Sequence, residues 1–220
     1  MPGQARMDGM ALRDYEQWLH HYDDPNSGLS WRLRHVQAWL GEELDRRPGP
    51  VKVLSVCAGD GRDIIDVLAG RDDASRVESV LLEAHPGIAD RARQRAATAG
   101  LTTVSVRTCD AADTSSYAGA VPADLVLLVG IFGNISRTDL SRTIAAAPQF
   151  CAPAATLLWS RGRDQDDVNA EIRAEFIAAG FSELDYEEAD LGAKPALGRM
   201  RYEGPPVPLV TGESLFTFWR

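Results

Sequence analysis

The sequence predicts an α/β protein in which a mostly parallel sheet is covered by helices on both faces. Short apolar segments alternate with segments of helical periodicity between residues 51 and 160. Right-handed crossovers between parallel strands place such helices on both faces of the sheet. The length of 220 residues, of which 45% are hydrophobic and 25% charged, also fits one core and therefore one domain.

The first 47 residues predict a helical cover or lid that belongs to the same domain as residues 48–220. Apolar residues recur at helical spacing over residues 11–21 and 29–47, and the segment HYDDPNSG between them is rich in turn residues. The second helix should end at RRPGP, because proline cannot continue it.

From residue 51 onward, strands and helices are expected in turn. Apolar and β-branched runs predict strands at residues 51–57, 77–83, 102–108, 124–129 and 155–160. Helical spacing, with proline and glycine at the boundaries, predicts helices at residues 62–69, 86–99 and 137–147.

The C-terminal part predicts one more helix and two more strands. The helix is expected at residues 167–179 and the strands at residues 181–186 and 214–219. The connection at residues 187–213 is rich in glycine and proline and is long for a loop in a compact domain. We therefore expect it to be partly structured or to form a functional lid, and to decide substrate choice together with HYDDPNSG.

Charge and composition disfavour nucleic acid and membranes as partners. Lys and Arg number 23 against 32 for Asp and Glu, so the formal net charge is −9, and such a chain repels phosphate groups. The most apolar stretch, residues 125–133, is shorter than the roughly 20 residues of a membrane span. The N-terminus has no apolar core of a signal peptide, which predicts a cytoplasmic protein.

The cysteines and histidines predict neither disulfides nor a metal site. Cys57, Cys109 and Cys151 lie far apart and are expected to be reduced thiols. Together with the four histidines they form no spacing typical of zinc ligands, so no metal is expected.

A glycine-containing turn marks the expected ligand site. The segment CAGDGRD, residues 57–63, joins the first strand of the sheet to the next helix, and open α/β sheets bind ligands beyond the carboxyl ends of their strands. Gly59 and Gly61 allow a sharp turn, and the helix start offers free N–H groups. Taken alone, the motif also fits a plain turn between a strand and a helix.

Acidic residues follow at the ends of the next two strands. Glu83 ends the apolar run VLLE, where it can accept hydrogen bonds from both hydroxyls of a ribose. Asp110 can accept a hydrogen bond from an adenine amine while the small Ala111 and Ala112 leave room for the purine; its alternative role is a helix N-cap. One glycine turn and two acids at successive strand ends predict a nucleoside site.

These segments resemble the motifs of class I S-adenosylmethionine-dependent methyltransferases, and the resemblance extends over residues 30–220. The segment VKVLSVCAGDGRD resembles their first motif, VLLEAHP their acidic motif, RTCDAAD their adenine-binding segment and ADLVLLVGIFGNIS their fourth-strand motif. The resemblance implies a Rossmann-like, doubly wound sheet of seven strands. The last strand, here SLFTFWR, would run antiparallel between the fifth and the sixth.

The resemblance also implies a single-domain bacterial enzyme that transfers the methyl group of S-adenosyl-L-methionine. Because the sequence indicates no added recognition domain and no basic surface, a small molecule is expected as the acceptor. The resemblance assigns cofactor binding to strand ends and to a tyrosine of the lid, namely Tyr22, Cys57, Ala58, Gly59, Asp60, Gly61, Asp63, Glu83, Ala84, Asp110, Ala111, Ala112, Gly130 and Ile131. The acid that the commonest first motif carries before its first glycine is replaced here by Ser55 and Cys57. Asp60 or Asp63 is therefore expected to face the aminoacid end of the cofactor.

A dinucleotide cofactor is the weaker alternative. The third glycine of a GxGxxG motif would fall at position 64, which is Ile64.

The end of the fourth strand is expected to border the transferred methyl group. Gly130 permits close approach, Ile131 or Phe132 can stack near the adenine or the acceptor, and Asn134 offers a donor and an acceptor. Alternatively, Asn134 or Ser136 caps the next helix. The acceptor pocket is expected to contain Phe132, Asn134, Trp159 and Arg161.

Arg161 has two possible roles. It can clamp a carboxylate or phosphate of the acceptor, or it can pair with the nearby Asp164, Asp166 and Asp167.

No catalytic residue is assigned from the sequence. Methyl transfer needs mainly positioning, and a base only where the acceptor must lose a proton. His20 or His21 in the lid is a candidate base, the alternative being a solvated loop histidine. Two other functions stay open: a cyclisation or rearrangement assisted by the positive charge of the bound cofactor, and a non-catalytic nucleoside-binding subunit.

Overall fold

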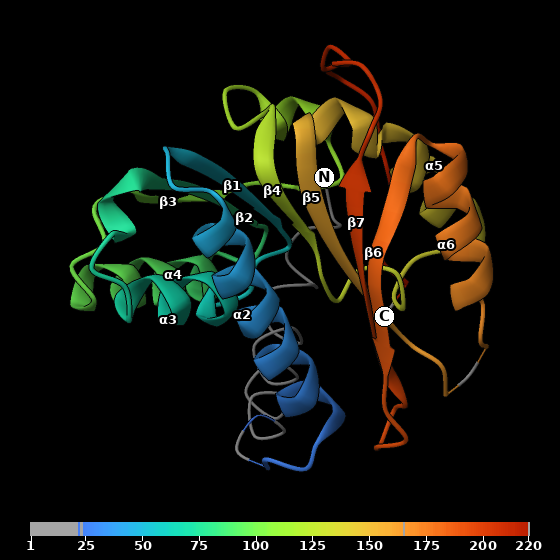
Figure 1. Ribbon diagram of the computed structural model, residues 1–220, viewed down its shortest axis with the longest axis horizontal. Coiled ribbons are helices and arrows are strands. Elements are labelled where there is room, and N and C mark those ends of the chain that lie inside the picture. Colours follow the sequence, from blue (N-terminus) through green and yellow to red (C-terminus); the bar gives the residue numbers. More distant parts are fainter. Residues whose placement is uncertain (1–21, 23, 165, 220) are drawn as a thin grey trace, which may run out of the picture.

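The computed structural model describes residues 22, 24–164 and 166–219 of the chain. In this part, one sheet has seven strands in the order β3-β2-β1-β4-β5-β7-β6, and β7 runs antiparallel to both of its neighbours. Helices α2, α3 and α4 lie on one side of the sheet and α5 and α6 on the other (Figure 1). The predicted doubly wound sheet, with an antiparallel last strand between the fifth and the sixth, is confirmed.

Each element follows from a local sequence pattern. The strands are β1 Val51–Val56, β2 Val77–Glu83, β3 Val104–Thr108, β4 Ala123–Leu128, β5 Cys151–Gly162, β6 Phe181–Glu188 and β7 Pro195–Tyr202. The α-helices are α2 Gly28–Arg46, α3 Arg62–Ala69, α4 Pro86–Thr98, α5 Arg137–Ala146 and α6 Asn169–Ala178. Short 3-10 helices are η2 Ala74–Arg76, η3 Thr114–Tyr117 and η4 Ala147–Phe150. The helix expected at residues 11–21 lies outside the described residues.

The inner strands are buried on both faces, as parallel strands under two helical layers must be. In β4, Leu125 and Leu127 face the core that contains α2 and α3, whereas Val126 and Leu128 face the core under α5 and α6. Successive side chains of a strand point to opposite faces, so one continuous apolar run serves both cores.

The prediction that the last strand lies at residues 214–219 is wrong. The seventh strand is Pro195–Tyr202, inside the segment expected to be a connection, and residues 214 and 218 form only isolated bridges outside the sheet. The strand β7, PALGRMRY, is not recognisable from its sequence, because it contains a glycine and an arginine that is buried in the structure.

Both unusual residues of β7 have a structural reason. A Cβ atom at Gly198 would lie 2.3 Å from Nε1 of Trp159, so only glycine fits beneath that indole. The side chain of Arg199 is 6% exposed and donates hydrogen bonds to Asp185 of β6 and to Glu42 and Glu43 of α2. A charge is tolerated there because three acids from other elements pair with it.

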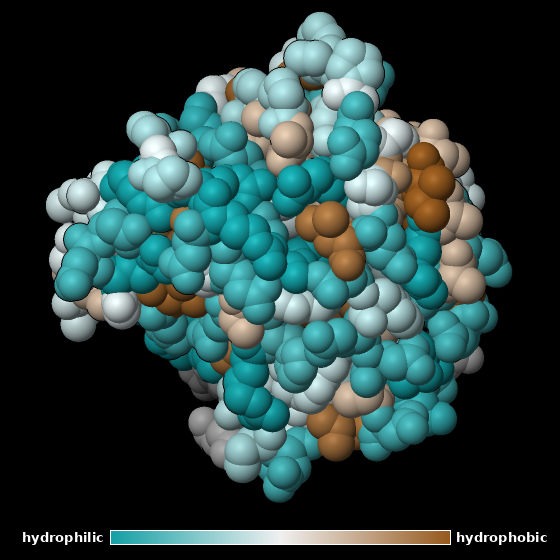
Figure 2. All heavy atoms as spheres, viewed as in Figure 1, coloured by the Kyte–Doolittle hydropathy of each residue, from teal (hydrophilic) through white to brown (hydrophobic). Residues whose placement is uncertain are grey.

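One face of the molecule is mainly polar. Figure 2 shows a face covered mainly by hydrophilic residues, with small separate hydrophobic areas. In the described part of the chain, no helix has the length and apolar character needed to cross a lipid bilayer.

Candidate cofactor and acceptor site

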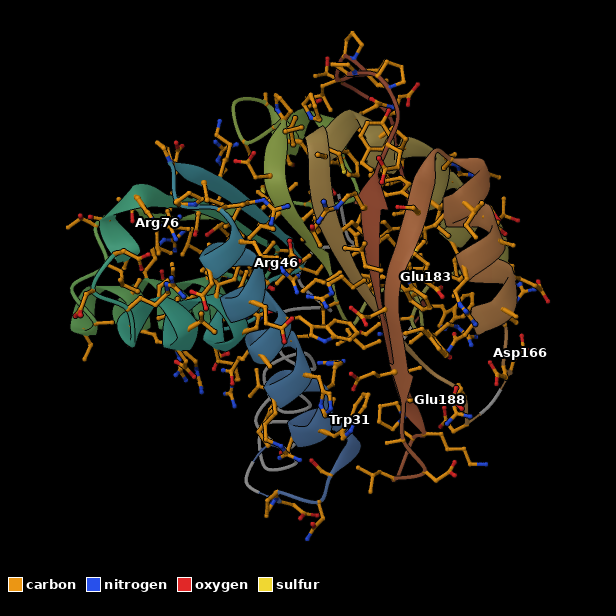
Figure 3. All side chains as sticks on the ribbon, in the orientation of Figure 1. Trp31, Arg46, Arg76, Asp166, Glu183 and Glu188 are labelled. Carbon is orange, nitrogen blue, oxygen red and sulfur yellow. The ribbon has the colours of Figure 1, made fainter. Side chains whose placement is uncertain are left out.

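A cavity of about 760 Å³ lies at the carboxyl ends of β1, β4 and β5. The first turns of α2 and the turn between β6 and β7 close it from the other side. Figure 3 labels Trp31 on α2 and Glu188 at the end of β6, which mark this end of the molecule. This is the edge at which open α/β sheets bind their ligands.

The cavity brings together about half of the residues expected at the site. Its lining includes Tyr22, Cys57, Ala58, Gly59, Asp60, Asp63, Gly130, Asn134 and Arg161. The expected residues that lie outside the lining are Gly61, Glu83, Ala84, Asp110, Ala111, Ala112, Ile131, Phe132 and Trp159.

The turn between β1 and α3 is held tightly to the sheet. The N–H of Ala58 donates to the carbonyl of Leu82 in β2 (2.9 Å), and the N–H of Gly61 donates to the carbonyl of Ala58 (3.0 Å). Gly59 and Gly61 have φ angles of 59° and 71°, which glycine adopts without strain. The turn therefore presents backbone to the cavity at a fixed position.

Gly61 has a packing role. A Cβ atom there would lie 2.6 Å from Cδ2 of Leu81 and 2.8 Å from Cδ1 of Ile65. This glycine lets α3 approach β2 closely and so orients the start of the helix, while its neighbour Gly59 lines the cavity.

The structure separates the two acids that the sequence left as alternatives. Asp60 is paired: Arg62 donates to both of its carboxylate oxygens (2.6 to 3.2 Å), and Arg95 lies 3.4 Å from one of them. Burial alone would raise the pKa of Asp60, but the hydrogen bonds and charges of these arginines lower it. Its charge is therefore already neutralised by the protein.

Asp63 is compensated less than Asp60. Burial raises the pKa of its carboxyl to about 6, although the N–H of Ile64 donates to it at 3.0 Å and the charge of Arg32 opposes the shift. A carboxylate that is costly to ionise beside a cavity is well placed to receive a cationic group. Of the two acids, Asp63 suits the ammonium group of an amino acid.

Glu83 ends β2 next to the same turn. One carboxylate oxygen accepts from the N–H of Gly59 and the other from the N–H of His85, both at 2.9 Å. Each carboxylate oxygen can accept a further hydrogen bond, so this fixed group keeps the capacity to bind two hydroxyls. At the end of β2, the Glu83 carboxylate is thus fixed next to Gly59, which lines the cavity.

The segment after β3 differs from the expectation. The side chain of Asp110 accepts from the N–H of Ala112 (2.8 Å), as a turn-capping residue does, and Asp110 is exposed. Ala111 and Ala112 are 3% and 7% exposed and pack in the core, and the hydroxyl of Tyr117 donates to the carbonyl of Ala111 (2.8 Å). The side chains of the two alanines point into the core and thereby fix the backbone of this loop.

The loop after β4 presents small and polar residues to the cavity. Gly130 has a φ of 79°, its N–H donates to Oγ of Ser160 (2.9 Å), and Nδ2 of Asn134 donates to the carbonyl of Gly130 (2.8 Å). Ser136, the other alternative, is the N-cap of α5 and accepts from the N–H of Asp139. Asn134 is therefore not the cap of this helix, and it lines the cavity.

The large side chains expected in the acceptor pocket point elsewhere. Ile131, Phe132 and Trp159 are 0%, 1% and 0% exposed and belong to the core between the sheet and α5 and α6. Phe132 and Trp159 both contact the ring of Phe176 on α6. The turn at Gly130 directs Ile131 and Phe132 into this core, and Trp159 points to the same face of β5, so none of them lines the cavity.

Arg161 combines features of both expected roles. It lines the cavity, and its Nη1 donates to the carbonyls of Gly162 and Asp166. Burial lowers its pKa, while the charges of Asp166, Asp167 and Asp164 act in the opposite direction. Its hydrogen bonds go to backbone carbonyls, and the aspartates act through their charge.

Two arginines at the site were missed by the sequence analysis. Nη2 of Arg32 donates to the hydroxyl of Tyr22 (3.1 Å), and the guanidinium of Arg62 lies 4.3 Å from the centre of the Tyr22 ring. Arg32 also packs against Gly130, where a Cβ atom would lie 3.4 Å from its Nη1. Nothing in the spacing of α2 distinguishes Arg32 from its neighbours, because its role depends on contacts with Tyr22 and with the loop after β4.

The titratable groups of the described cavity include no histidine. Burial raises the pKa of the Cys57 thiol, as do the charges of Glu83 and Asp110, so this cysteine is protonated at neutral pH and is a poor nucleophile. Burial also raises the pKa of Tyr22. His20 and His21, the candidate bases, lie outside the described residues.

Comparison with known proteins supports the fold. No protein-family model and no curated protein matches the sequence. Magnesium protoporphyrin IX methyltransferase (ChlM) from Synechocystis PCC 6803, solved with bound SAM, matches with a TM-score of 0.70 and 14% identity, over 91% of this chain and 95% of its own. The chain has the class I methyltransferase fold.

Two further matches show what this methyltransferase fold carries in other proteins. The 1,6-didemethyltoxoflavin-N1-methyltransferase of Burkholderia thailandensis matches with a TM-score of 0.66 and 16% identity, over 91% of this chain and 88% of its own. The [4+2]-cyclase SpnF matches with a TM-score of 0.53 and 15% identity, over 71% of this chain and 76% of its own. The fold therefore occurs in methyltransferases and in a cyclase.

Proposed function

We propose that the protein binds S-adenosylmethionine and transfers its methyl group to a small molecule. The observation that carries the proposal is the Glu83 carboxylate, fixed by the N–H groups of Gly59 and His85 beside the cavity. A carboxylate fixed in this way at the end of the second strand suits the two ribose hydroxyls of a nucleoside.

The residues around the cavity fit the other parts of this cofactor. Asp63 would hold the ammonium group, because ionising its buried carboxyl is favoured by a neighbouring cation. Gly59 and Gly130 bring bare backbone to the cavity, and Tyr22 would cover the ligand from the lid side. Asp110, Ala111 and Ala112 would border the adenine through the backbone and the Asp110 carboxylate.

The chemistry needs little more from the chain than position. The cofactor supplies a methyl group on a positively charged sulfur, which a nucleophilic atom of the acceptor displaces in line. Asn134, Ser160 and Arg161 supply polar groups along the rest of the lining and would orient the acceptor. The volume of about 760 Å³ lies within the range of small-molecule sites, which run from about 300 to 1,000 Å³.

Isothermal titration with S-adenosylhomocysteine tests the cofactor assignment. We expect the native protein to bind it and Glu83→Gln and Glu83→Ala to weaken binding at least tenfold, since hydrogen bonds to a charged group contribute about 1.5–3 kcal/mol each. Glu78→Gln is the matched control, because Glu78 lies exposed on the same strand. No binding by the native protein, or equal binding by all variants, would overturn the assignment.

A second candidate function keeps the cofactor without methyl transfer. The likeness to a [4+2]-cyclase favours it, because that protein shares the fold. Incubation of the protein with S-adenosylmethionine and a panel of small acceptors separates the two: methyl transfer yields S-adenosylhomocysteine with each methylated product, whereas a cyclisation converts the substrate without yielding it.

A further inference from the structure

The chain beyond β7 returns to the edge of the sheet that carries the cavity. Residues 212–215 run alongside the loop after β3, where the N–H of Thr114 donates to the carbonyl of Glu213 (2.9 Å) and the N–H of Leu215 to that of Ala112 (2.8 Å). The chain then reaches the loop after β4, where the N–H of Trp219 donates to the carbonyl of Asn134 (3.1 Å). We call residues 213–219 the return segment.

Buried side chains fix the return segment in place. Leu215 and Phe216 are 1% and 2% exposed and belong to the core. Nη1 of Arg142 donates to the carbonyl of Leu215, and the N–H of Thr217 donates to Asp139, both at 3.3 Å. The last residues of the segment therefore have a defined position against the loop after β4.

The pairing register decides which way the two final aromatic residues face. Phe218 pairs with Ile135 in an antiparallel bridge, and its ring contacts that of Phe216 at 5.2 Å between centroids. Opposite residues of an antiparallel pair share a face, and successive residues alternate. In this register Trp219 lies opposite Asn134, on the other side of the bridge from Phe218. Asn134 lines the cavity, and Trp219 follows directly outside the lining.

Trp219 is 57% exposed in this position. Among the described residues, Trp219 and Phe218 are the aromatic members of the exposed large hydrophobic set, and the others are Ile177, Leu184, Val207 and Val210. An exposed indole has a large flat apolar surface with no partner, and such side chains beside a concave site are typical of ligand recognition.

We propose that Trp219 is an acceptor-binding residue and that the acceptor is a planar aromatic small molecule that stacks on its indole. The proposal rests on the proposed function for the identity of the neighbouring cavity. Asn134 would give the same molecule a polar contact. Its backbone carbonyl accepts a hydrogen bond from the N–H of Trp219, and Asn134 lines the cavity. The return segment would thereby act as part of the acceptor site.

The test uses two probes of similar size on the full chain saturated with S-adenosylhomocysteine, and on the chain alone. The probes are 2-naphthol, which is planar and aromatic, and trans-2-decalol, which is neither, and ligand-observed NMR titration gives both dissociation constants. We expect 2-naphthol to bind at least fivefold more tightly than trans-2-decalol. Trp219→Ala should weaken 2-naphthol about tenfold, and Trp219→Phe should restore part of the loss.

Matched controls separate stacking from misfolding and from failure of the cofactor assignment. Ile177→Ala removes an equally exposed apolar side chain on α6 and should leave both probes unchanged. Retained S-adenosylhomocysteine affinity and thermal midpoint show that Trp219→Ala is folded. Equal 2-naphthol affinity in the native protein and Trp219→Ala, or no 2-naphthol binding by the native protein, would overturn the proposal. Absence of S-adenosylhomocysteine binding alone would overturn the proposed function.

Discussion

The turn between β1 and α3 and the turn between β6 and β7 border the cavity from opposite sides, and different contacts hold them. Positive-φ glycines, a backbone hydrogen bond within the turn and backbone hydrogen bonds to the adjacent strand β2 fix the first turn. The second, residues 189–194, packs against the start of α2, where a Cβ atom at Gly28 would lie 2.4 Å from the carbonyl oxygen of Gly192. Hydrogen bonds thus hold the first wall to the next strand of the sheet, whereas the second wall depends on packing between two segments far apart in the chain.

The largest expected effect comes from the first wall. Gly61→Ala combines a φ of 71° with contacts of 2.6 and 2.8 Å to Leu81 and Ile65. We expect a loss of about 2–5 kcal/mol in the free energy of unfolding, from about 1–2 kcal/mol of left-handed strain and about 1–3 kcal/mol of overpacking. Urea denaturation measures it.

Gly100→Ala is the control for this substitution. Gly100 has a similar φ of 70°, but no atom lies within 4 Å of its Cβ position. It should therefore show the strain alone, about 1–2 kcal/mol. Equal losses in the two variants would contradict the close packing of α3 against β2.

The second wall predicts an intermediate effect. Gly28→Ala places a methyl group against the backbone of Gly192, so the start of α2 and the turn must move apart, at an expected cost of about 1–3 kcal/mol. Gly41→Ala in the same helix has open space and should instead stabilise the protein by up to about 1 kcal/mol. Urea denaturation of both variants tests the contact, and a stabilised Gly28→Ala would refute it.

A smaller effect distinguishes Asp63 from Asp60 within the first wall. The pKa of Asp63 is raised from 3.8 to about 6, so its contribution to stability falls as the pH rises from about 4 through 6. Asp63→Asn should therefore raise the thermal midpoint at pH 8 by a few degrees and have little effect at pH 4. Asp60→Asn should lower the midpoint at pH 8, because it weakens the pairing with Arg62 and Arg95. Calorimetry at both pH values decides between these outcomes.

The same carboxyl predicts how cofactor affinity depends on pH. If Asp63 binds the ammonium group, S-adenosylhomocysteine affinity in the native protein should rise from pH 5 to pH 7, by up to tenfold for each unit below the pKa of about 6. In Asp63→Asn this rise should be absent and the affinity at pH 7 lower. An unchanged pH profile in the variant would assign the ammonium group to another residue.

Much of the fold could be predicted from local pattern. The ranges of α3 and β2 agree with the prediction at both ends, because Gly61 and Gly70 flank the helix and the apolar run VLLE ends the strand. The strand Pro195–Tyr202 could not be found in the same way. From the sequence alone, Arg199 is expected at the surface. It is buried because acids of α2 and β6, which lie far away in the chain, pair with it.

The candidate site shows the same division. Turn glycines and strand-end acids are visible in the sequence, and most of the β1–α3 turn does line the cavity. The direction of large side chains is not visible there: Phe132 and Trp159 are buried, whereas the return segment carries an exposed Trp219 to the loop after β4.

The sequence by itself determined the alternation of strands and helices, the edge of the sheet at which the cavity lies and the acids beside it, because burial periodicity and backbone turns are short-range properties. Only the tertiary structure decided which segment fills the place between β5 and β6, which of Asp60 and Asp63 is already paired, and which aromatic residues are buried and which exposed. Those outcomes depend on partners such as Arg95 and Asn134, which lie far away in the chain and meet these residues only when the two cores have formed.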